Sequence, residues 1–383
     1  MRIPFNRLAP LGSEQDYIAE ALTKGHLSAS GPFTARCEAA LVEQTGASAV
    51  ILTVSATAAL EMAALLLNLA EGDEVIMPSY TFVSTANAVR LRGAIPRFVD
   101  ISSDTLNMSP DHVEAAMGPR TRAIMPVHYA GVACDMDRLG RLASQAGIPI
   151  VEDAAHAIGS RHRGRALGSI GKLGVFSFHE TKNIGCGEGG ALLINDPALV
   201  ERASILRDKG TNRKAFMEGR VDKYSWVDIG SSYGIADPLA AFLLGQIEQL
   251  DRVTRRRCDI HEAYAGALAP LEEQGLVTLP RVKDRNAHNG HAFWMLLPSA
   301  ADRPPFLRHL DSRGVQSVFH YVPLHLSAVG RSLGYNPGDL PVTEDIAPRL
   351  VRLPVFATLT DDQQARVVEA IYEWGVGYKR QES

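Results

Sequence analysis

Residues 174–183 read GVFSFHETKN and are followed at residues 185–190 by GCGEGG. The first part has the apolar, β-branched character of a buried strand, and the glycines suit a tight return into another strand. Lys182 therefore lies in a loop at the end of a strand, where an amine that loses its proton through burial or nearby positive charge can form a Schiff base. Most lysines are exposed, so Lys182 becomes a functional candidate only if other residues supply the rest of a site.

The sequence on both sides of this stretch has the pattern of an α/β protein. Short apolar runs alternate with helix-like segments, and the runs cover residues 50–53, 74–77, 123–127, 148–151, 174–178 and 191–194. Residues 57–69 are rich in alanine and leucine and lead to the turn Glu71-Gly72-Asp73, as a crossover helix does. This alternation predicts a mainly parallel sheet flanked by helices.

The pattern changes after about residue 235. A long helix-like stretch runs from Pro238 to beyond His261, and the remaining chain has a strand-like segment and two helix-like segments, at residues 292–297, 305–313 and 361–374. A chain of 383 residues is long enough for two domains. The sequence predicts a large domain over residues 1–246 and a small α+β domain over residues 247–383.

An acidic pair follows another apolar run, in the segment PIVEDAAH at residues 149–156. The carboxyl ends of strands in an open α/β sheet are where ligands bind. Because side chains alternate along a strand, Glu152 and Asp153 point in opposite directions, and we expect only one of them to serve. A carboxylate at this position can hold a pyridinium nitrogen protonated, although Asp153 can equally be a helix N-cap and His156 a structural histidine.

Two further segments place candidate binding groups at strand ends. Residues 53–60, TVSATAAL, join a strand to a helix, and the free amides of such a helix start can bind phosphate, although an ordinary Ser or Thr cap is the commoner explanation. Phe82 in the segment PSYTF can stack on a pyridine ring or belong to the core. No GxGxxG fingerprint follows the early runs, which argues against a dehydrogenase. One crevice can collect the phosphate site, the aromatic ring, the acid and Lys182.

Composition and charge exclude several classes of protein. The net charge of -4 and the pI near 6.3 leave no broad basic field for nucleic acid. Charged residues interrupt the first twenty positions, and no later stretch of membrane-spanning length is free of charge. The four cysteines stand far apart without a CxxC pair, which suits neither a zinc site nor a disulfide framework. We therefore expect a cytoplasmic protein with no metal site and no nucleic acid or membrane partner.

Together these segments resemble the DegT/StrS-type sugar-nucleotide aminotransferases, a family with pyridoxal phosphate (PLP) fold type I. The resemblance covers essentially the whole chain, from IPFN at residues 3–6 to LPVF at residues 353–356. It implies that the large domain binds PLP, with Lys182 as the Schiff-base lysine and Asp153 at the pyridine nitrogen. Further cofactor-binding roles are implied for the ring neighbours His156 and Phe82 and for the phosphate-binding residues Ala56, Thr57 and Ser177.

The resemblance also implies partners for the chain. Members of the family are homodimers with shared active sites, in which a neighbouring subunit often lends an asparagine to the phosphate. In this chain the matching stretch is DIGSSY at residues 228–233, where Ser232 could donate instead. The implied substrates are a nucleotide sugar and L-glutamate, which is the amino donor.

Four segments are most similar to family members that convert TDP-4-keto-6-deoxyglucose to TDP-4-amino-4,6-dideoxygalactose for surface polysaccharides. They are SFHETKN, MPSYTFVSTAN, PVHYAG and FHYVPLH, which begin at residues 177, 77, 126 and 319. Another nucleotide or a 3-keto sugar stays an alternative. The candidates to line a sugar pocket, each of which can instead be a buried structural residue, are His128, Tyr129, His320, Tyr321 and His325.

Two rival functions use the same scaffold. Related sugar dehydratases carry histidine in place of the lysine, whereas Lys182 is present here. A non-catalytic scaffold or regulator is a rival of a different class, because fold does not fix function, but such a protein has no need of Lys182 and Asp153. The sequence therefore favours transamination.

Overall fold

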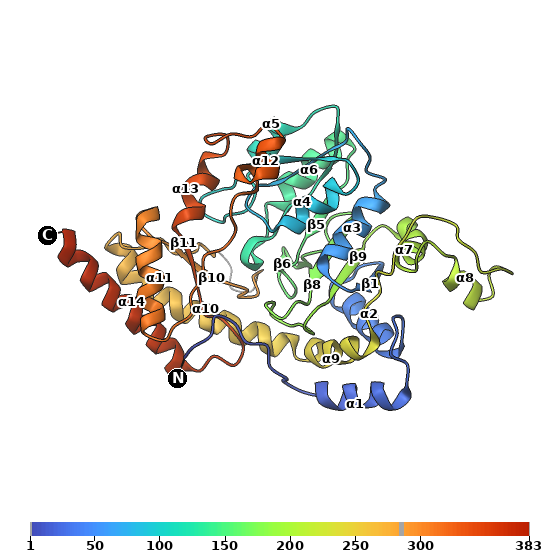
Figure 1. Cartoon of the computed structure of the whole chain (residues 1–383), viewed down its shortest axis with the longest axis horizontal. Coiled ribbons are helices and arrows are strands. Elements are labelled where there is room, and N and C mark those ends of the chain that lie inside the picture. Colours follow the sequence, from blue (N-terminus) through green and yellow to red (C-terminus); the bar gives the residue numbers. More distant parts are fainter. Residues whose placement is uncertain (1, 283–286, 383) are drawn as a thin grey trace.

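The computed structural model describes residues 2–282 and 287–382 and has the mixed α/β architecture that the sequence predicts (Figure 1). The strands of its central sheet are β1 (Ala49–Thr53), β2 (Glu74–Pro78), β3 (Ile95–Val99), β4 (Thr121–Ile124), β5 (Val151–Asp153), β8 (Leu173–Ser177) and β9 (Gly190–Ile194). Hydrogen bonds connect them in the orders β1-β9-β8-β5 and β3-β2-β4. Parallel bridges from Ile124 to Ile150 and from Val127 to Asp153 join the two groups.

Most neighbouring strands are parallel, as predicted. β2 pairs in parallel with β3 and β4, and β5 pairs in parallel with β8. β9 runs antiparallel to both β8 and β1. All strands of this sheet except β9 therefore end at the same edge. β9 begins there, so Gly190 lies opposite both Thr53 and Ser177.

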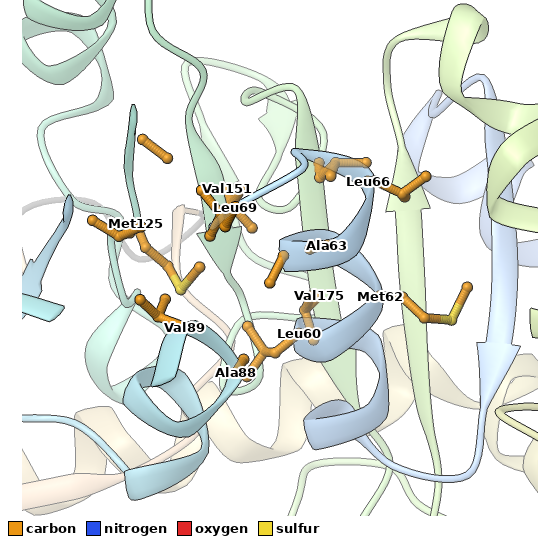
Figure 2. Packing of buried hydrophobic residues seen from close by; sticks show 14 of the residues in the cluster. Leu60, Met62, Ala63, Leu66, Leu69, Ala88, Val89, Met125, Val151 and Val175 are labelled. Carbon is orange, nitrogen blue, oxygen red and sulfur yellow. The ribbon is translucent and has the colours of Figure 1, made fainter. Parts of the chain in front are cut away.

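Helices bury both faces of the sheet, which explains why the strands read as continuous apolar runs. On one face, Val151 and Val175 belong to a core cluster with α3 (Ala56–Leu66), α4 (Val83–Arg90) and α7 (Val200–Arg207). Figure 2 shows Leu60 of α3 beside Val175. On the other face, alternate strand residues such as Phe176 pack with α2 (Pro32–Thr45) and α9 (Asp237–Glu248).

The remaining elements of the first part of the chain lie around this core. They are α1 (Glu14–Lys24), α5 (Pro110–Ala116), α6 (Met136–Ala146), the hairpin strands β6 (Arg161–His162) and β7 (Arg165–Ala166), and α8 (Arg213–Met217). Figure 1 shows α8 standing away from the body of the molecule, on the side opposite the C-terminus. All four cysteines are buried free thiols.

The C-terminal part of the chain builds a separate apolar cluster. Its elements are α10 (Leu250–Glu273), β10 (Phe293–Leu296), α11 (Arg303–Ser312), α12 (Ala328–Ser332), α13 (Pro341–Arg349), β11 (Leu350–Leu353) and α14 (Asp361–Glu382). β10 and β11 pair antiparallel, and Ile3 joins the cluster through a bridge to Val315. Within residues 2–282 and 287–382, no helix combines the length and the apolar character needed to cross a bilayer.

One expectation about the long helix-like stretch is wrong in detail. Residues 238–261 do not form a single helix, because α9 ends at Glu248 and α10 begins at Leu250. Gln249 between them has φ -101 and ψ 4, outside the helical region. The domain boundary between residues 246 and 247 falls in the last turn of α9 and stays a prediction.

Candidate active site

A cavity of about 590 Å³ opens at the edge of the sheet where the parallel strands end. Its walls include strand-end residues of the large unit, namely Ser55, Ala56, Thr57, Phe82, Asp153, His156, Ser177 and Lys182. The opposite walls come from the first residues of the chain and from the C-terminal part, namely Phe5, Asn6, Arg257, His291, His320, Tyr321 and Arg352. The fold therefore collects the predicted strand-end groups in one place.

Lys182 lies in the loop between β8 and β9, where its backbone N–H donates to the carbonyl of His179. The side chain is half-buried. Burial lowers the pKa of Lys182 to about 8 although the Asp153 carboxylate opposes the shift, and the positive charge of Arg352 lowers it further. An appreciable fraction of this amine is therefore neutral near pH 7, which a nucleophilic lysine requires.

Asp153 ends β5 and turns its carboxylate into the cavity. Oδ2 accepts a hydrogen bond from the hydroxyl of Thr85 at 2.7 Å, and Oδ1 accepts one from the amide of Ala155 at 3.2 Å. No helix begins after Asp153, so the N-cap alternative does not apply. Two hydrogen-bond donors fix the carboxylate in one orientation.

Glu152 points away from the cavity, as strand alternation requires. Its carboxylate is fully buried and accepts from His128 Nε2 at 2.9 Å and from the amides of Gly168, Ile170 and Gly171. Burial raises the pKa of this carboxyl, but the hydrogen bonds outweigh it and leave the pKa below its usual range. Glu152 therefore anchors the chain that leads into β8 and takes no part in the cavity.

The helix start after β1 leaves amides free at the cavity. Ser55 is the N-cap of α3, and its hydroxyl accepts from the amide of Ala58 at 3.1 Å. The amides of Ala56 and Thr57, the first two positions of the helix, have no acceptor within it. A Cβ on Gly190 would collide with the Ala56 amide, so glycine allows β9 to approach this point closely. Two free amides and the nearby hydroxyl of Ser177 suit an anion such as phosphate.

His156 and Phe82 present rings to the cavity. Phe82 is 57% exposed and lines the cavity, so the alternative of a core phenylalanine does not hold. The His156 ring stacks on that of His291 with centroids 4.2 Å apart, and its Nε2 is 3.1 Å from the hydroxyl of Tyr321. Burial and the charge of Lys182 hold the pKa of His156 well below its usual range. Its Nδ1 is buried and has no partner, so it can take a hydrogen bond from a ligand.

The sugar-pocket candidates separate into two groups. His320 and Tyr321 line the cavity, and Tyr129 supports them from behind through a 2.8 Å hydrogen bond between its hydroxyl and His320 Nδ1. His128 and His325 do not reach the cavity. His128 is engaged by Glu152, and His325 lies between Ser79 Oγ at 2.6 Å and Glu344 Oε1 at 3.0 Å. Both are fully buried structural histidines.

Ser232 also lies outside the cavity of its own chain. It is exposed and forms an isolated bridge with Asp208. A role in this cavity therefore requires a second copy of the chain.

Several residues that line the cavity were not predicted from the sequence. His291 is held by a 2.8 Å hydrogen bond between its Nδ1 and Asn183 Oδ1, directly after Lys182. Thr85 orients Asp153, and Arg257 and Arg352 bring positive charge from the C-terminal part. A charged residue within an apolar strand, as in Leu350–Leu353, was the one available signal for Arg352.

The arrangement fits PLP. Free helix amides suit its phosphate, the Asp153 carboxylate suits a protonated pyridine nitrogen, and the unpartnered His156 Nδ1 suits the ring hydroxyl. The exposed Phe82 offers a face for stacking, and Lys182 offers an amine of lowered pKa for the aldehyde. Among residues 2–282 and 287–382, no group of three His, Cys, Asp or Glu side chains could hold a metal ion.

Residues 12–372 match the model of the DegT/DnrJ/EryC1/StrS aminotransferase family. The aminotransferase TlmJ from Streptoalloteichus hindustanus is 31% identical with a TM-score of 0.90, over 98% of this chain and 100% of TlmJ. DesV from S. venezuelae is 34% identical with a TM-score of 0.88, over 97% of this chain and 98% of DesV. The PLP form of Spr1654 from Streptococcus pneumoniae is 27% identical with a TM-score of 0.88, over 96% and 97% of the two chains.

Proposed function

The chain belongs to the DegT/DnrJ/EryC1/StrS aminotransferase family and is a PLP-dependent sugar aminotransferase, and on that premise we propose its reaction. The amino group of L-glutamate is transferred to C4 of a nucleotide-linked 4-keto-6-deoxy sugar. The proposed substrate is TDP-4-keto-6-deoxyglucose, the product TDP-4-amino-4,6-dideoxygalactose, and the role the supply of amino sugars for surface polysaccharides. The proposed location of the enzyme is the cytoplasm.

The observation that carries the proposal is the position of His320 and Tyr321. Both line the cavity from the segment FHYVPLH, whose sequence resembles that of the C4-aminating members of the family. Tyr129 and His156 hold the two rings in place through hydrogen bonds of 2.8 and 3.1 Å. Fixed polar groups of this kind discriminate between substrates, because the wrong isomer leaves them unpaired.

The residues around the cavity have distinct proposed roles in the chemistry. PLP, when bound, supplies the electron sink that allows the C–H bond at the α-carbon of the amino donor to break. Asp153 keeps a proton on the pyridine nitrogen, and Thr85 holds that carboxylate in position. Lys182 has an amine of lowered pKa, so it can accept the proton from the donor and return it. His156, Phe82, Ala56, Thr57 and Ser177 bind the cofactor.

The proposed assembly is a homodimer with shared active sites. Residues 216–229 form an arm around and after α8, with Met217 73% and Trp226 79% exposed. The same arm exposes Phe216, Val221, Tyr224, Val227 and Ile229, and so many exposed apolar side chains on one segment favour a protein partner. Ser232 follows the arm directly, so an arm that packs on a second copy would carry Ser232 toward that copy. This supports the proposal that Ser232 serves the partner's phosphate site.

A comparison of two keto sugars tests the substrate proposal. The 4-keto sugar should have a much higher kcat/KM than a 3-keto isomer on the same nucleotide, by up to ~10⁴-fold if buried polar groups discriminate. His320→Ala should erode this ratio more than it weakens the reaction with L-glutamate. Equal values for the isomers, or a preference for the 3-keto sugar, would contradict the regiochemistry and leave the aminotransferase activity in place.

A further inference from the structure

Arg352 is a cation of the cavity wall whose hydrogen-bonding capacity is largely unused. It lies on β11, and its Nη2 donates to the carbonyl of Phe319 at 3.2 Å. The guanidinium carbon lies 4.7 Å from the centroid of the Phe5 ring, so the planar group is stacked in place. Nε is buried and has no acceptor. Within the described part of the chain, Arg352 forms no ion pair with a carboxylate.

Other arginines nearby show what a structural role looks like. Arg257 also lines the cavity, but its Nε and Nη2 donate to the carbonyls of Gly290 and His291. Arg349, at the end of the helix that leads into β11, donates to the Leu297 carbonyl and pairs with Asp345 at 2.5 Å. A buried donor without an acceptor costs about 1–3 kcal/mol. Arg352 has such a donor in its Nε. A ligand oxyanion that accepts a hydrogen bond from Nε would remove this cost.

The position of Arg352 indicates which of two oxyanions it binds, the α-carboxylate of the amino donor or the diphosphate of the nucleotide sugar. Arg352 lines the same cavity as Lys182, the amine that handles the reacting proton. In agreement with this position, the charge of Arg352 adds to burial in lowering the pKa values of Lys182, His156 and His291. The α-carboxylate of an amino donor is attached to the carbon that loses this proton. The diphosphate of a nucleotide sugar is separated from C4 by the width of the sugar ring. Planar guanidinium groups match carboxylates through two parallel hydrogen bonds.

We propose that Arg352 binds the α-carboxylate of the amino donor. This inference rests on the proposed transamination but not on the identity of the sugar. It makes Arg352 a residue that orients the donor's α C–H bond toward Lys182.

The test follows the two half-reactions of the holoenzyme separately. L-glutamate alone converts the aldehyde form of the cofactor to its amine form, which the loss of visible absorbance reports. Arg352→Gln should raise the L-glutamate concentration needed for half-maximal rate by about 10–100-fold, the range of a charged hydrogen-bonded pair. Arg352→Lys keeps the charge but loses the planar fork, so we expect an intermediate increase. Arg349→Gln is the matched control and should stay within twofold of wild type.

Two further measurements distinguish the α-carboxylate from the side-chain carboxylate of L-glutamate and from a phosphate of the nucleotide sugar. L-alanine has the α-amino and α-carboxylate groups of L-glutamate but no side-chain carboxylate, so Arg352→Gln should penalise both donors by the same factor. A penalty with L-glutamate alone would move Arg352 to the side-chain carboxylate and overturn the proposal. A loss confined to the return reaction with a nucleotide keto sugar would assign Arg352 to a phosphate and also overturn it. The first half-reaction uses no sugar. The L-glutamate dependence of the Arg352 variants can therefore be interpreted even if the proposed sugar is wrong.

Discussion

Replacing Lys182 by methionine should stabilise the cofactor-free protein while it abolishes turnover. The environment lowers the pKa of Lys182 from an ordinary 10.5 to about 8, mainly by burial. Each pKa unit corresponds to about 1.4 kcal/mol between the two protonation states, so at pH 7 the folded chain bears a penalty of up to ~3 kcal/mol for this amine. Methionine has a similar length, carries no charge and escapes the penalty.

The stability gained by Lys182→Met should decrease as the pH rises. Below pH 8 the amine is protonated in both the folded and the unfolded chain, and the penalty is complete. Between pH 8 and 10.5 the folded chain releases the proton first, so the wild-type protein recovers stability as the pH rises. The advantage of Lys182→Met should therefore fall from ~3 kcal/mol at pH 7 to ~1 kcal/mol at pH 10.

Urea unfolding of both cofactor-free proteins at pH 7 and pH 10 measures this difference. Lys172→Met is the control, because Lys172 forms a partly exposed ion pair with Asp196 and its loss should cost no more than about 1 kcal/mol. A methionine variant no more stable than wild type at pH 7 would refute the reasoning. So would a gain of the same size at both pH values.

Two more substitutions test the geometry around Lys182, and a third tests the dimer. Asp153→Asn should lower kcat/KM by at least about 30-fold, equivalent to ~2 kcal/mol of lost charge stabilisation, with an unchanged circular dichroism spectrum; activity within threefold of wild type would argue against a pyridinium partner. Thr85→Val removes a donor to that carboxylate, so a smaller fall of about fivefold is expected in the same assay, and no change would mean that Ala155 suffices. Trp226→Ser should raise the dimer dissociation constant measured by analytical ultracentrifugation, whereas an active monomer of the wild-type chain would remove the dimer proposal altogether.

Local patterns predict the sheet well because its strands are buried on both faces. The runs of β1, β2, β8 and β9 fall within one residue of their observed limits, those of β4 and β5 fall within three, and their order along the chain implies the shared edge. β3 was missed, since its sequence IPRFV contains proline and arginine and lacks a continuous apolar run. The break at Gln249 was missed as well, because the residues on both sides of it favour helix.

The strand-end residues Lys182, Asp153 and Phe82 were predictable because topology alone brings their side chains to one edge. The positions of His128 and His325 outside the cavity were not predictable, since the partners of these two histidines are distant in sequence. His128 is hydrogen-bonded to Glu152, 24 residues away, and His325 is hydrogen-bonded to Ser79, 246 residues away. His291 and Arg352 reach the cavity only because the C-terminal unit folds back over the sheet. No local pattern carries that information.

The central claim is that Lys182 is the residue that binds the cofactor. The most direct measurement is to add PLP to the purified protein, reduce it with borohydride, digest it and locate the pyridoxyl group by peptide mass spectrometry. The loop after β8 offers an amine of lowered pKa beside Asp153, so the modification should be found on Lys182 and should disappear in Lys182→Met. Stoichiometric modification of a different lysine, or of none, would contradict the account.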